Sequence, residues 1–138
     1  MTRSHEPLIR LARFKVEELQ KQMAELDRSK AALISQIERL EASVPEEQAI
    51  ATQSKDGYLA YGSYAQAVIK RKDNIRASLT EVEAQSDALR DRLSEAFQEL
   101  KKYELLEERR LARAETALRE SEQAELDEMA SIRHRRAH

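Results

Sequence analysis

The chain has 138 residues, of which 36% are charged and 4% aromatic, with 2 Gly, 2 Pro and no Cys. So few glycines exclude a sheet protein with many tight turns and a Gly-rich phosphate loop, and the lack of cysteine excludes disulfides and thiolate metal sites. The formal net charge of -2, from 24 basic and 26 acidic residues, is unlike that of a nucleic-acid-binding domain. With 41% hydrophobic residues and few helix breakers, the composition favours long helices over disorder.

Apolar residues recur every seven positions through the first third of the chain. One series is Ile9, Val16, Met23, Lys30, Ile37 and Val44, and the other, offset by three, is Ala12, Leu19, Leu26, Leu33 and Leu40. Ten of these eleven residues are apolar, and Lys30 is the exception. A strict seven-residue repeat is typical of a coiled-coil seam, because a straight helix on a globular core drifts away from it. Proline is tolerated in a first helical turn and disfavours helix before it, so Pro7 and Pro45 predict a helix over residues 7–44.

Residues 45–63 interrupt the repeat. They contain Pro45 and both glycines, and we interpret them as a connector. Three of the four tyrosines gather at this turn: Tyr58, Tyr61 and Tyr64. They are either an aromatic cap that closes the end of the coil or a contact patch, since amphipathic rings suit interfaces.

A second seam follows the connector. One series is Val68, Ile75, Val82, Leu89, Ala96 and Tyr103, and the other is Ala65, Lys72, Leu79, Ser86, Leu93 and Leu100. The strict repeat ends there, because the next two positions hold Glu107 and Arg110. No helix breaker follows, so we expect the second helix to span residues 64–134.

Two helices joined by this connector of about 20 residues should fold back antiparallel. The preferred register pairs Val44 with Val68, Ile37 with Ile75, Leu33 with Leu79, Met23 with Leu89, Leu19 with Leu93, and Ala12 with Leu100. A slip of one heptad sets Ala12 against Glu107 and Ile9 against Arg110, which is worse but still an alternative. The fold class predicted is all-α: a single antiparallel coiled-coil hairpin over residues 1–138, with a second helix that overhangs the first by about 30 residues.

Candidate contact residues gather near the end away from the turn. The apolar ones lie off the seam and are Leu11, Phe14, Leu105 and Leu106, and the basic ones open the unpaired stretch of the second helix and are Arg109, Arg110 and Arg113. Scattered exposed apolar residues are ordinary, but several at one end make a patch that suits a partner protein. The arginines are either solvated or dock onto an acidic protein surface.

Motifs for chemistry are missing from the sequence. It contains no Ser/His/Asp arrangement, Walker loop or HExxH motif, and no third ligand converges on His134 and His138. We therefore expect no catalytic residue, metal or cofactor, and neither a small-molecule substrate nor nucleic acid as a partner. The longest apolar run, residues 31–34, is too short for a membrane span or a signal peptide, which favours a cytoplasmic protein.

Two long segments carry a family resemblance. PLIRLARFKVEELQKQMAEL and AFQELKKYELLEERRLARAETALRESEQAELDEMASIRHRR resemble the flagellar export protein FliJ, particularly its alphaproteobacterial branch. The resemblance implies a two-helix antiparallel coiled coil, similar to the stalk of rotary ATPases, in the ring of the flagellar type III export ATPase. It also implies contacts with the membrane export gate and with export chaperones, at the inner face of the cell membrane.

In that setting the overhanging helix is expected to enter the ATPase ring, and the tyrosine turn to contact the gate. Two alternatives remain. A prefoldin-like chaperone also has two long helices, but needs β-hairpin strands that residues 45–63 do not favour. A generic coiled-coil scaffold, such as a homodimer joined through the overhang, needs nothing beyond the heptads.

Overall fold

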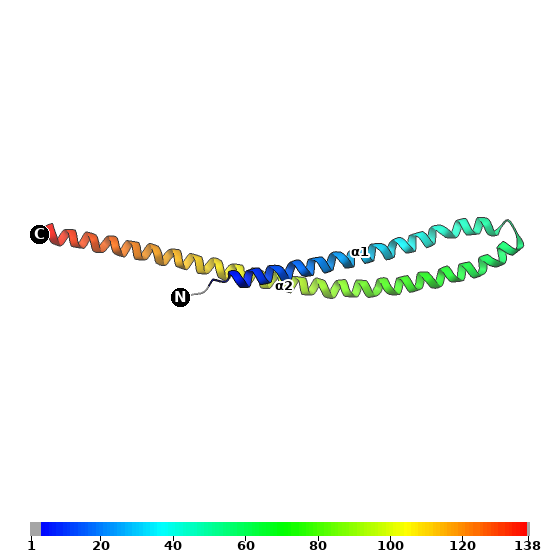
Figure 1. Cartoon of the computed structure of the whole chain (residues 1–138), viewed down its shortest axis with the longest axis horizontal. Helices are drawn as coiled ribbons and strands as arrows, with labels where there is room; N and C mark the ends of the chain where they lie inside the picture. The colour runs from blue at the N-terminus through cyan, green and yellow to red at the C-terminus, as the bar shows by residue number, and fades with distance from the viewer. Residues whose placement is uncertain (1–3, 138) are drawn as a thin grey trace. The chain divides into compact units, whose positions relative to one another are not determined.

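The computed structural model describes residues 4–137, which form two α-helices and no strand (Figure 1). Helix α1 spans Glu6–Ala51 and helix α2 spans Lys55–Ala137. The chain divides into two compact units: the turn unit, Glu17–Ser94, and the end unit, Met1–Val16 with Glu95–His138. In each unit a stretch of α1 packs against a stretch of α2, which confirms the all-α helical hairpin; the single unit over residues 1–138 stays a prediction.

The seam of the turn unit is built from the heptad positions of both helices. Its buried apolar residues are Leu19 and Ala51 from α1, and Val68, Ile75 and Leu89 from α2. Three ion pairs cross this seam: Lys30 Nζ lies 3.8 Å from Glu83 Oε1, while Lys72 Nζ and Arg76 Nη2 lie 3.1 Å and 4.0 Å from Glu41 Oε1. In the preferred register each lysine faces a seam residue of the other helix, and the acid that pairs with the lysine directly follows that seam residue in the sequence. The preferred register is therefore confirmed in the turn unit.

The expected helix end at residue 44 and the connector over 45–63 were wrong. Helix α1 continues through Pro45 to Ala51, and only residues 52–54 separate it from α2. The reason lies in the seam: Ala51 is one heptad beyond Val44 and is buried. Burial of this last turn offsets the backbone hydrogen bond that Pro45 cannot donate.

The turn itself is closed by Ser54. Its hydroxyl accepts a hydrogen bond from the backbone N–H of Gly57 at 2.9 Å, which is the geometry of an N-cap. Gly57 lets the first turn of α2 approach α1, because a Cβ there would lie 3.3 Å from the carbonyl oxygen of Ile50. The second helix therefore begins nine residues before the expected residue 64, and all three tyrosines of the turn stand on it.

The end unit contains the start of α1 and the second part of α2. Its buried apolar seam residues are Ile9, Ala12 and Val16 from α1, and Ala96 from α2. Lys15 Nζ lies 3.8 Å from Glu99 Oε2 across the seam, as the preferred register requires. Farther along α2 every residue from 111 to 131 is exposed, so the expected overhang is present in the end unit.

Candidate partner-binding surface

The paired part of the end unit exposes apolar side chains of α1 outside its seam. Leu11 is 66% exposed and Phe14 58% exposed, one helical turn apart. Together with Pro7 and Arg10 they form a shallow, mostly apolar hollow on the outer face of α1. These two residues are where the sequence placed them, and each is available to a partner.

The same side of the end unit continues onto α2. Lys15 of α1 and Glu99 of α2 form an ion pair across the seam. Seven residues earlier in α1 the same heptad position holds Leu8, and seven residues later in α2 it holds Leu106. Leu8 and Leu11 share a groove with Tyr103, which links the apolar residues of the two helices. Leu8 and Leu11 therefore lie beside Tyr103 of α2, in a groove that does not include Leu106.

A second shallow groove follows the outer face of α2. It is lined by Gln98, Lys101, Lys102, Leu105, Leu106 and Arg109. No carboxylate is among these residues, so the two leucines are flanked by three positive charges. Apolar side chains within a basic border suit a partner with an apolar, acidic surface.

The three candidate arginines differ in their surroundings. Arg109 and Arg113 are exposed on α2. Arg110 is half-buried and donates two hydrogen bonds to Glu107 Oε1, from Nε at 3.1 Å and from Nη2 at 2.6 Å. This bond to the Glu107 carboxylate raises the pKa of Arg110. Arg110 is thus engaged within the end unit, whereas Arg109 and Arg113 point to solvent.

Glu107 is a buried carboxylate that the sequence indicated only as a break in the heptad pattern. The residue is 8% exposed, and its Oε2 accepts a hydrogen bond from the backbone N–H of His5 at 2.6 Å. The hydrogen bonds from Arg110, then the one from the His5 backbone, lower the pKa of Glu107 from 4.5 to about 2. The signal available beforehand was that Glu107 continues the series Leu93–Leu100 and falls opposite the start of α1 in the preferred register.

The tyrosines of the turn unit divide into two groups. The rings of Tyr61 and Tyr64 lie 6.3 Å apart at 37°, both are half-buried, and the Tyr64 hydroxyl shares a hydrogen bond with Ser43 of α1. Tyr58 is 71% exposed. Tyr61 and Tyr64 therefore brace the helix pair near the turn, and Tyr58 is the ring of the three most available to a partner.

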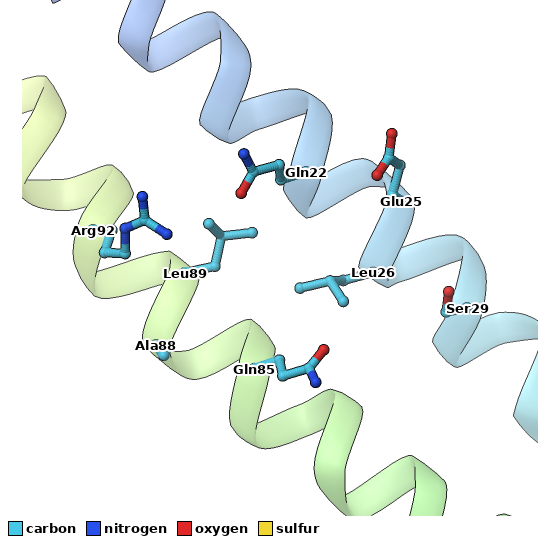
Figure 2. Close-up of a pocket in the computed structure, with 8 residues that line it drawn as sticks. All are labelled: Gln22, Glu25, Leu26, Ser29, Gln85, Ala88, Leu89 and Arg92. Carbon is cyan, nitrogen blue, oxygen red and sulfur yellow. The ribbon is translucent and has the colours of Figure 1, made fainter.

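The turn unit also has a shallow groove between its helices (Figure 2). Leu26 and Leu89 point toward each other at its floor, while Gln22, Glu25 and Arg92 lie around them. Within residues 4–137 there is no group of three His, Asp or Glu side chains placed to hold a metal ion. Of the two C-terminal histidines considered as ligands, His138 lies outside the described residues. Neither helix, over the same residues, contains a stretch apolar and long enough to cross a bilayer.

Comparison with known proteins gives one consistent family. The family model described as "Flagellar FliJ protein" matches residues 3–138. Two curated relatives, each named "Flagellar FliJ protein", come from Caulobacter vibrioides strains NA1000 / CB15N and ATCC 19089 / CB 15. Each is 28% identical over 130 residues, covering 94% of this chain and 94% of the relative. No solved structure matches this chain significantly.

Proposed function

Since the chain belongs to the flagellar FliJ protein family, it is a component of the flagellar export apparatus, and we propose that it acts there as a non-enzymatic stalk. In this role it couples the export ATPase to the membrane export gate and contacts export chaperones. It works in the cytoplasm, peripheral to the inner face of the cell membrane, and needs no cofactor, nucleic acid or small-molecule substrate.

The observation that carries this proposal is the uncovered part of α2 in the end unit. Leu111, Leu118, Leu126 and Met129 are each more than half exposed there. Apolar side chains that recur along an uncovered helix favour a binding element over a solvated end. The grooves on the paired part of the end unit are shallow and open, which suits contact with proteins better than chemistry on an enclosed substrate.

We assign the ATPase contact to the surface formed by Leu11, Phe14, Leu105, Leu106, Arg109 and Arg113. Its apolar centre would become buried on binding, and its arginines would attract an acidic rim of the ring and so orient the encounter. Arg110 belongs to the same end but supports the surface through Glu107. For the gate contact we assign the tyrosine turn, with Tyr58 as the contacting ring and Tyr61 and Tyr64 as its support.

The test measures ATP hydrolysis by the purified cognate export ATPase with and without this protein. The test variant is Arg109→Glu with Arg113→Glu, and the matched control is Arg28→Glu with Arg39→Glu, two exposed arginines of the turn unit. We expect the wild type and the control to stimulate the ATPase and the test variant to lose stimulation, with equal helical content by circular dichroism. Equal stimulation by both variants would refute the assigned surface, and a wild type that neither binds nor stimulates the ATPase would refute the stalk.

Neither alternative function gains an observation in its favour. A prefoldin-like chaperone needs strands between its helices, and residues 52–54, which join α1 to α2, leave no room for them. A generic scaffold held together through the overhang would form a stable homodimer. Sedimentation equilibrium of the purified protein, expected to give a monomer mass of 15.9 kDa, distinguishes it from the stalk.

A further inference from the structure

We infer that Glu107 is a cap supplied by α2 to the start of α1, and that this cap fixes the register of the helix pair in the end unit. The inference concerns how the protein sets the point at which α2 leaves α1. It does not depend on the proposed function.

The start of α1 is completed by groups from α2. His5 is the N-cap residue, because its carbonyl oxygen accepts the N–H of Ile9 at 2.9 Å while its own N–H lies outside the helical ladder. That N–H donates to Glu107 Oε2 at 2.6 Å, and His5 Nδ1 lies 3.0 Å from the same oxygen. The Ser4 hydroxyl donates to Oε1 at 3.3 Å. The carboxylate therefore holds the residues that begin α1 and sits at the positive end of its dipole.

Arg110 completes the site from the other side. Its two hydrogen bonds to Oε1 neutralise the carboxylate within one turn of α2. Both oxygens of Glu107 are thus satisfied, which is the condition for keeping a charge at a buried seam position. Apart from Ser86, Glu107 is the only buried polar residue among residues 4–137.

The apolar seam alone discriminates poorly between registers. Its positions repeat every seven residues, so a slip of one heptad still sets apolar residues against one another along most of its length. In the slipped pairing Glu107 faces Ala12, and its carboxylate loses both His5 and Ser4 while staying in the seam. The carboxylate keeps Arg110, which lies on the same helix, but its Oε2 stays at a buried position without the His5 donors. A buried oxygen left without its hydrogen bonds costs free energy that the apolar seam does not return, so the cap favours one register.

The register has a direct geometric consequence. A slip of one heptad would cover seven more residues of α2, about 10 Å of helix at 1.5 Å per residue. Glu107 therefore fixes how much of α2 stays uncovered. If the proposed stalk is correct, the same carboxylate sets the length of the element that reaches the ATPase.

Disulfide trapping tests this inference, since the chain has no cysteine of its own. The pair Val16→Cys with Ala96→Cys reports the observed register, in which both positions are buried. The pair Val16→Cys with Tyr103→Cys reports the slip of one heptad. Each pair is equilibrated in a glutathione redox buffer in three backgrounds: wild type, Glu107→Leu, and the control Glu108→Leu, which alters an exposed carboxylate next in the chain.

We expect the slipped pair to cross-link negligibly in the wild-type and Glu108→Leu backgrounds. In Glu107→Leu its yield should rise about tenfold or more, because losing even one hydrogen bond to a charged group shifts an equilibrium by at least about that factor. An unchanged slipped yield in Glu107→Leu, or an equal rise in Glu108→Leu, would overturn the inference. If Glu107→Leu fails to fold by circular dichroism, Glu107→Gln, which keeps the shape and removes the charge, decides by the same criterion.

Discussion

Gly57 and Gly62, both near the start of α2, offer a sharp test of how this helix begins, because their surroundings differ. A Cβ at Gly57 would lie 3.0 Å from Ser54 Oγ, 3.3 Å from the Ile50 carbonyl oxygen and 3.5 Å from Ala51 Cα. A Cβ at Gly62 would meet nothing within 4 Å. The substitutions Gly57→Ala and Gly62→Ala therefore gain the same helix propensity and differ only in these contacts.

In an exposed helix, replacing Gly by Ala stabilises by roughly 0.8–1 kcal/mol, and we expect that full gain for Gly62→Ala. At Gly57 the methyl group presses on Ser54 Oγ, which cannot move away without losing its hydrogen bond to the Gly57 N–H. That cap is worth about 1 kcal/mol, and the Ile50 carbonyl is backbone that cannot yield alone. The free energy of unfolding should therefore stay level or fall by up to about 1 kcal/mol in Gly57→Ala.

Urea unfolding followed by circular dichroism at 222 nm measures both variants. The two unfolding free energies should differ by about 1–2 kcal/mol, with Gly62→Ala the more stable. Should Gly57→Ala stabilise the protein as much as Gly62→Ala, the close approach of the two helices at the turn and the capping role of Ser54 would both be wrong.

Three further predictions use the same denaturation assay. Leu19→Ala, at a position 3% exposed, should lower the free energy of unfolding by about 2–4 kcal/mol. Leu118→Ala, at a position 60% exposed, should change it by less than about 0.5 kcal/mol. Similar losses in both variants would contradict the assigned seam. Pro45→Ala should stabilise the protein by about 1–3 kcal/mol, since proline inside a helix removes a hydrogen bond and strains the preceding turn; a destabilised variant would mean that the turn unit needs the proline. The lowered pKa of Glu107, about 2 against its ordinary 4.5, means that its contribution is full above about pH 4.5 and is lost as the pH falls toward 2. Wild type should thus lose stability relative to Glu107→Gln over this range, and parallel pH profiles would show that the carboxylate is not held as described.

The candidate surface was only partly foreseeable. Leu11, Phe14, Arg109 and Arg113 lie off the seam by their heptad positions alone, so their exposure follows from the period. Arg110 shares its type and neighbourhood with Arg109, yet it bonds to Glu107. That difference arises because position 110 falls on the side of α2 that faces the start of α1.

The sequence alone determined the helical class and the seam, because a repeat of seven dictates which face of each helix must be covered. It favoured one register without excluding a slip of one heptad, because the repeat looks the same after seven residues. Local rules were misleading at the turn, where Pro45 and the glycines predicted a break and the buried Ala51 kept α1 helical to its end. The role of Glu107 was decided only by the tertiary structure. A charged residue at a seam position becomes a cap only when hydrogen-bond donors from a distant segment reach it, as the His5 N–H reaches Glu107. The pattern of residues along the sequence cannot show which donors will lie there.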